Sequence, residues 1–199
     1  APPAAAGHMA RADGFPRGAP AADGDDAEAL ALRGTVRLER WTRHLEPDPR
    51  AAAALLADAE SDLRRAVALA PQDAAAWSAL ARVYYEKPNL IEATLATRRA
   101  YEADAYLANA DALLWRLYAS SYDTENFLDA RQWCDEGRRR FPRNPAFVRC
   151  QLWLFTSAAQ EPDVARAWRL VDSLRAVAPA SEWPALGREA RLLAAAGAG

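Results

Sequence analysis

The sequence predicts an all-α fold in which pairs of helices follow one another along the chain. Of its 199 residues, 51% are hydrophobic, and many of these are alanine, a strong helix former. Apolar residues recur at helical spacing between prolines and Asp or Asn residues, which typically stand at helix ends. A short pattern of small and apolar residues also returns four times at a nearly constant period. Together these observations predict a helical repeat protein.

The recurring pattern places small and apolar residues at offsets 0, 4 and 7, and a proline at offset 12. The first copy consists of Ala59, Leu63, Ala66 and Pro71. The later copies contain Ala93 and Ala100, then Ala130, Cys134 and Gly137, then Ala167, Val171 and Leu174. The copies end at Pro71, Ala105, Pro142 and Pro179, which are 34, 37 and 37 residues apart. We expect small residues where the helices of a pair approach closely, because a large side chain would push them apart.

Capping residues and prolines predict the helix boundaries. A first helix is expected to begin after Asp25 or Asp26 and to end by Pro47. Asp48 and Pro49 predict the start of the second helix, because Asp caps free N–H groups and proline suits the first helical position. Further helix starts are expected at Asp73, at Asn144 with Pro145, and at Ser181.

Residues 74–107 contain the best-defined copy. Trp77, Leu80, Ala81 and Tyr84 lie at relative offsets 0, 3, 4 and 7. They resemble the tetratricopeptide repeat (TPR) family, whose 34-residue helix–turn–helix unit carries W-x2-L-G-x2-Y in its first helix. The resemblance implies a right-handed α-solenoid over residues 25–199, with about four helix pairs and a partial fifth. Residues 1–24 are rich in Ala, Pro and Gly without apolar periodicity, and they predict a disordered tail or linker.

The resemblance also implies a place for a partner, because the first helices of successive TPR pairs line a concave groove that receives a peptide. Matching the groove positions gives Ser78, Arg82 and Tyr85, then Trp115, Ala119 and Tyr122, then Leu152, Thr156 and Ala159. The expected partner-binding residues are Ser78, Arg82, Tyr85, Trp115, Tyr122 and Thr156. Two interpretations of the aromatic members stay open: Trp115 and Tyr122 either face a partner or pack inside the solenoid.

The residues give no sign of catalysis, of a cofactor or of a metal site. The chain has two histidines and none of the common hydrolase, metalloprotease, nucleotide or dinucleotide motifs. Its acidic residues alternate with arginine along predicted helices, as on solvated faces. Examples are Asp62 with Arg65 and Asp172 with Arg175. We therefore do not expect an enzyme.

Charge and hydropathy limit the class of partner. A net charge of −2 and a pI near 5.8 give no overall attraction to nucleic acid. The tightest basic cluster is Arg138, Arg139, Arg140 and Arg143. It stands at a predicted helix C-terminus, where the helix dipole favours cations, and binding of phosphate there is the less favoured alternative. No apolar run is long enough to cross a bilayer.

The two cysteines, Cys134 and Cys150, fall among apolar residues of predicted helices. They lack CxxC or Cys/His spacing, so two buried free thiols are expected. Free thiols fit a reducing cytoplasm, and a cytoplasmic location is the expectation.

The function expected from these features is a protein–protein interaction module that holds a peptide or partner domain in its groove. The alternative is a structural or oligomerising solenoid, which includes homo-oligomer formation. The helix ends EADAYL and WCDEGRRRFP are similar to TPR tails of bacterial signalling proteins that carry Ser/Thr kinase or transcription-regulator domains. The resemblance thus also implies a regulatory tail of a larger protein.

Overall fold

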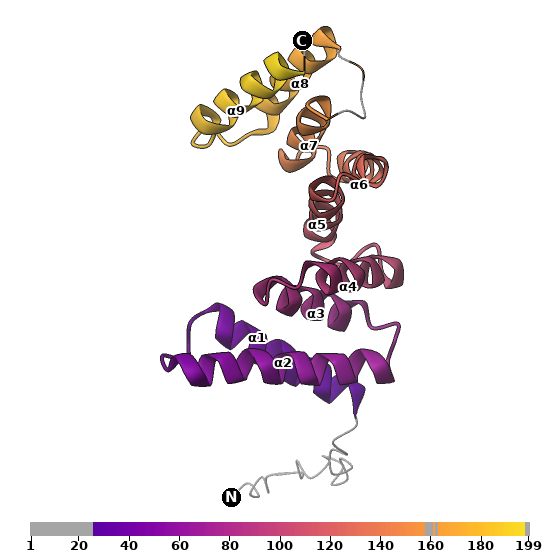
Figure 1. The fold of residues 1–199 in the computed structure, drawn as a ribbon, viewed down its shortest axis with the longest axis vertical. Coiled ribbons are helices and arrows are strands. Elements are labelled where there is room, and N and C mark those ends of the chain that lie inside the picture. The colour runs from indigo at the N-terminus through magenta and orange to yellow at the C-terminus, as the bar shows by residue number, and fades with distance from the viewer. Residues whose placement is uncertain (1–25, 158–160, 162, 198–199) are drawn as a thin grey trace, which may run out of the picture.

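A computed structural model describes residues 26–157, 161 and 163–197, and this part of the chain is helical without any strand (Figure 1). The all-α prediction is therefore confirmed. The expected tail, residues 1–24, lies outside the described residues. The described part contains nine helices: α1 (Ala27–Thr42), α2 (Pro49–Leu69), α3 (Ala74–Glu86), α4 (Leu90–Ala103), α5 (Ala110–Asp123), α6 (Phe127–Arg140), α7 (Ala146–Phe155), α8 (Val164–Val177) and α9 (Trp183–Ala196).

The helices are arranged along one long axis, with α1 and α2 at one end and α8 and α9 at the other (Figure 1). The most extensive contacts join α1 with α2, α3 with α4, and α5 with α6. Each even-numbered helix also packs on the odd-numbered helix that follows it. In addition, α1 contacts α3, α5 contacts α7, and α7 contacts α9. Packing is thus local along the sequence, as in proteins assembled from stacked units.

The small residues of the recurring pattern lie in the interior, as predicted. The buried members are Ala59, Leu63, Ala66, Ala93, Ala100, Ala130, Cys134, Gly137, Ala167, Val171 and Leu174. Gly137 differs from the expectation, because its close approach is to the helix that follows its pair: a Cβ added there would lie 2.1 Å from Cε1 of Phe147 in α7. Helix α6 can approach α7 this closely because glycine has no side chain.

Large residues complete the core between the pairs. Leu80 and Tyr84 of α3 are buried. Trp77 is only partly buried, and its indole N–H donates to the carbonyl oxygen of Pro71 at 2.9 Å. This tryptophan therefore contributes to the edge of the core rather than to its centre.

Side-chain caps begin several helices where the sequence predicts them. The carboxylates of Asp26, Asp48 and Asp73 accept hydrogen bonds from backbone N–H groups in the first turns of α1, α2 and α3. The prediction for Ser181 is wrong, because α9 begins at Trp183 and no side chain caps it. The proline after Trp183 instead occupies the first turn, where its missing N–H costs nothing.

The expectation that Asp62 lies on a solvated face is also wrong. The sequence predicts it on a solvated face beside Arg65, but its side chain is 7% exposed and lies against α1. Arg33 donates to both Asp62 oxygens, at 2.8 Å from Nε and 2.6 Å from Nη2, and Arg37 donates as well. The hydrogen bond from Arg33 is the main cause that lowers the pKa of the Asp62 carboxyl despite its burial. Spacing within α2 cannot reveal these partners, because both come from another helix.

The prediction of two free thiols is also wrong. Cys134 of α6 and Cys150 of α7 are fully buried and form a disulfide with a Cα–Cα distance of 5.9 Å. That separation lies within the usual range for a disulfide. The bond becomes possible because α6 and α7 pack against each other directly after the turn that joins them. Neither cysteine has a sequence neighbour that signals this pairing.

No helix in the described ranges combines the length and apolar character needed to cross a membrane.

Candidate partner-binding face

A row of side chains connects the odd-numbered helices from one end of the molecule to the other. Each member contacts a side chain or backbone group on or beside a neighbouring odd-numbered helix through a hydrogen bond, an ion pair or a ring. We call this row the odd-helix face. Its members are Glu39, Thr42, Ser78, Arg82, Tyr85, Asn109, Arg116, Ser120, Tyr122, Arg149, Trp153, Thr156 and Glu189.

The row begins with an ion pair between α1 and α3. Arg82 donates from Nη1 to Glu39 at 2.7 Å and from Nη2 to the hydroxyl oxygen of Thr42 at 3.2 Å. The hydrogen bond from Arg82 is the main cause of a lowered pKa for the Glu39 carboxyl. Arg82, an expected partner-binding residue, is therefore already engaged within the chain, although its side chain stays 30% exposed.

Ser78 has a structural role. It is 5% exposed, and its hydroxyl oxygen accepts a hydrogen bond of 2.9 Å from Nδ2 of Asn109. Asn109 stands at the start of α5 and makes no side-chain cap there. The bond links the beginnings of α3 and α5, so Ser78 orients two units rather than presenting a free hydroxyl to a ligand.

Tyr85 connects α3 to α5 in two ways. Its hydroxyl lies 3.4 Å from the hydroxyl of Ser120, and the guanidinium of Arg116 stacks on its ring at 5.0 Å from the centroid. Such stacking of arginine on an aromatic ring is favourable. Burial is nevertheless the main influence on Arg116, and it lowers the pKa of that guanidinium.

The aromatic residues of α5 form a tilted series along one side of the helix. Trp115 contacts Tyr118 at 5.2 Å and Tyr118 contacts Tyr122 at 5.7 Å, between ring centroids. Trp115 and Tyr122 are both partly buried against the core around Leu114. These two aromatics thus pack on the core without being fully buried. That they face a partner stays a prediction.

Tyr122 continues the row into α7. Its hydroxyl donates to the carbonyl oxygen of Trp153 at 3.2 Å and lies 3.2 Å from the hydroxyl of Thr156. Its ring meets the Trp153 ring edge-on at 6.1 Å. Two of the expected residues, Tyr122 and Thr156, therefore lie together. Ala159, matched from the fourth repeat, lies outside the described residues, and Leu152 is fully buried.

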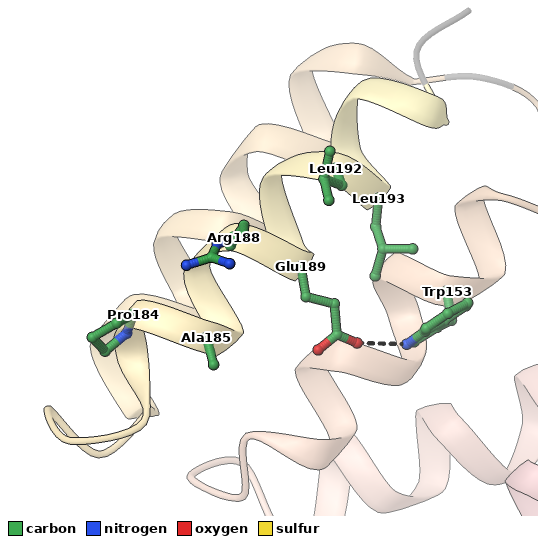
Figure 2. A pocket seen from close by; sticks show the side chains of 7 residues that line it. All are labelled: Trp153, Pro184, Ala185, Arg188, Glu189, Leu192 and Leu193. Atoms are coloured by element: carbon green, nitrogen blue, oxygen red, sulfur yellow. Dashed lines mark hydrogen bonds between the residues drawn. The ribbon is translucent and has the colours of Figure 1, made fainter.

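The last contacts of the row join α7 to α9 beside a shallow pocket of about 600 Å³ (Figure 2). The Trp153 indole N–H donates to Glu189 at 3.0 Å, and Arg149 donates to both oxygens of the same carboxylate at 2.9 and 3.0 Å. Figure 2 shows Trp153 and Glu189 next to each other, joined by this hydrogen bond. The residues that line it are Trp153, Pro184, Ala185, Arg188, Glu189, Leu192 and Leu193.

Sequence matching misses Arg116, Trp153 and Glu189. The buried residues Leu80 and Tyr84 of α3 recur as Leu114 and Tyr118 of α5, which are 34 residues later. This register places Arg116 at the position of Arg82, whereas the matching above places Ala119 there. The spacing of buried residues could have given the better register. Glu189 is invisible to such matching because it lies on α9, beyond the repeats that were matched.

The comparisons with known proteins add no family. A scan against protein-family models and a search of curated proteins found no match. Within the described ranges, no group of His, Cys, Asp and Glu side chains is arranged to hold a metal ion.

Proposed function

We propose that this chain is a protein-interaction module, a right-handed α-solenoid of TPR-like helix pairs that holds a peptide or partner domain against its odd-helix face. The observation that carries the proposal is the continuity of that face from Glu39 of α1 to Glu189 of α9. One row of aromatic, hydroxyl and charged groups, all but Ser78 at least partly exposed, crosses five helices. The local packing of consecutive helices supports the solenoid arrangement.

The composition of the face suits recognition of a protein. Tyr, Trp and Arg are the residues that most often dominate binding energy at protein interfaces. Here Tyr85, Tyr122 and Trp153 are held by hydrogen bonds and ring contacts, so little side-chain entropy is lost when a partner binds. Trp153 is 36% exposed and borders the pocket between α7 and α9, which makes it the best candidate anchor.

The test is selection of peptides from a randomised library displayed on phage, followed by measurement of affinity for the selected peptides. Substituting Trp153→Ala should weaken binding by roughly 30-fold, which corresponds to about 2 kcal/mol for an interface anchor. The matched control is Leu128→Ala, an 80% exposed apolar residue on α6 and outside the odd-helix face. Equal affinities of the Trp153→Ala variant and the unaltered protein would exclude this anchor, and a library without binders would contradict the proposed function.

The second candidate is a structural or oligomerising solenoid, including the regulatory tail of a larger signalling protein. The apolar pocket at α9 favours it, because Leu192, which lines the pocket, is 66% exposed. Light scattering across a dilution series distinguishes the two candidates. An interaction module for another protein should keep the mass of one chain, whereas a self-assembling solenoid should change mass with concentration.

The compartment is part of the proposal too. The cytoplasmic location expected from the sequence depends on two free thiols, and the Cys134–Cys150 disulfide removes that basis. Structural disulfides persist mainly in oxidising compartments. We therefore propose that this protein acts outside the reducing cytoplasm, where the Cys134–Cys150 bond persists.

A further inference from the structure

Three arginines occupy related places on the odd-helix face. Arg82, Arg116 and Arg149 lie on α3, α5 and α7, and they are 34 and 33 residues apart. Each reaches toward a neighbouring odd-numbered helix: Arg82 contacts α1, Arg116 contacts α3 and Arg149 contacts α9. The three guanidiniums thus form a series with nearly the spacing of the repeat.

The two outer arginines have the same kind of partner. Arg82 binds the carboxylate of Glu39, and Arg149 binds both oxygens of Glu189. In each case a glutamate on an adjacent odd-numbered helix supplies the negative charge. The N···O distances of 2.7 to 3.0 Å are typical of charge-assisted hydrogen bonds.

The middle arginine has no such partner in the described part of the chain. Arg116 forms no hydrogen bond or ion pair there, and its contact is the ring of Tyr85. Its Nη1 atom is buried without an acceptor. The negative charge of Glu86 raises the pKa of the Arg116 guanidinium through space, and the positive charge of Arg82 lowers it. A guanidinium carries five N–H donors and no acceptor, so this site is suited to an anion.

Neutral donors accompany the guanidinium. Ser120 lies one helical turn after Arg116 on α5, so the two side chains share a face. Its hydroxyl and that of Tyr85 are 3.4 Å apart. A planar carboxylate with two oxygens could therefore bind Arg116 and a hydroxyl at the same time.

We propose that Arg116 recognises an acidic side chain, Asp or Glu, of the partner that binds the odd-helix face. The inference rests on the proposed function and specifies its ligand. A partner carboxylate at Arg116 would complete the series in which Glu39 and Glu189 serve the outer arginines. The partner is thus a protein segment with an acidic residue positioned over the contact between α3 and α5.

The test uses single amino-acid probes on the full chain. Arginine Nε–Hε signals are followed by NMR while N-acetyl-glutamate N-methylamide is added, whose carboxylate is on the side chain alone. We expect a saturable shift at Arg116, with affinity at least about tenfold above that of the matched glutamine N-methylamide, because an ionic hydrogen bond is lost. Arg143, an exposed arginine outside the odd-helix face, should show only a small shift that does not saturate.

A second probe and a variant separate the possible outcomes. N-acetyl-glutamine with a free α-carboxylate tests a terminal carboxylate, and equal or tighter binding of this probe would overturn the assignment to an acidic side chain. In the Arg116→Gln variant, the response of the Tyr85 ring signals to the glutamate probe should fall about tenfold. Equal shifts at Arg116 and Arg143 would overturn the proposal without any variant. A library that yields no peptides, with the Arg116 shift intact, would contradict the proposed function alone.

Discussion

The contact between α1 and α2 and the contact between α6 and α7 are both close, yet different chemistry holds them. At the first, the buried carboxylate of Asp62 binds Arg33 and Arg37 across the helix pair. At the second, Cys134 and Cys150 are covalently joined among apolar residues. The first contact depends on protonation and the second on redox conditions. These two contacts within one helical array should therefore respond to different changes in solution.

Among the changes that test this comparison, loss of the disulfide should have the largest effect on the free energy of unfolding. The Cys134→Ala/Cys150→Ala variant should lower the free energy of unfolding by about 3 kcal/mol, because the cross-link closes a loop with a sequence separation of 16. Urea unfolding followed by circular dichroism measures the change. Reductant should destabilise the unaltered protein and leave the variant unaffected. Equal stability of the two proteins without reductant would contradict a structural role for the bond.

A matched pair of glycines tests how tightly each contact is packed. In Gly137→Ala the new Cβ would lie 2.1 to 2.7 Å from three atoms of the Phe147 ring, so we expect a loss of about 2 kcal/mol. In Gly34→Ala one atom would lie closer than 3.0 Å, Cγ of the buried Leu63 at 2.7 Å, and the carbonyl oxygen of Ala59 would lie at 3.2 Å, so the overlap is smaller. The higher helix propensity of alanine then offsets the strain, and the loss should stay under about 1 kcal/mol. The urea midpoints of the two variants measure both losses of stability. A larger loss for Gly34→Ala than for Gly137→Ala would show that α1 and α2 pack more tightly than α6 and α7.

Acid should weaken the α1–α2 contact selectively. Because Arg33 and Arg37 lower the pKa of Asp62 in the folded chain, the stabilisation is complete above the unfolded value of about 3.9 and is lost as pH falls through the lower, folded value. The Asp62→Asn variant should lose about 1 to 2 kcal/mol at pH 7, a modest loss because both arginines can be rehydrated. The difference between variant and unaltered protein should shrink below pH 4. A difference that stays constant from pH 7 to pH 3 would exclude this linkage.

The all-α fold and the buried small residues could be predicted because they follow from patterns within single helices. Ala59, Ala66 and Ala100 are recognisable by spacing alone, and the caps at Asp48 and Asp73 depend on residues three positions away. Asp62 could not be placed in the same way, since its partners lie 25 and 29 residues earlier on another helix. The cysteine pair poses the same difficulty.

The candidate face was predicted only in part, for a related reason. Repeat matching identifies Tyr85, Tyr122 and Thr156, which the structure connects through the odd-helix face. It misplaces the third repeat by about one turn, because it allows three extra residues before α5, whereas the buried residues of α5 follow those of α3 by 34 residues. Whether an arginine has a carboxylate partner depends on which residues lie near it in space. Only the structure therefore shows that Arg82 is paired with a glutamate and that Arg116 contacts the ring of Tyr85 instead.

The position of the disulfide also has a mechanical consequence. The bond joins the two helices on either side of the turn from α6 to α7, so a pulling force applied to the ends of the chain passes through the sulfur atoms and leaves the segment between them slack. When this array is stretched to full extension, roughly 50 Å of contour length stays hidden inside the cross-linked loop. Reduction releases that length, so the same chain is shorter and stiffer when oxidised than when reduced.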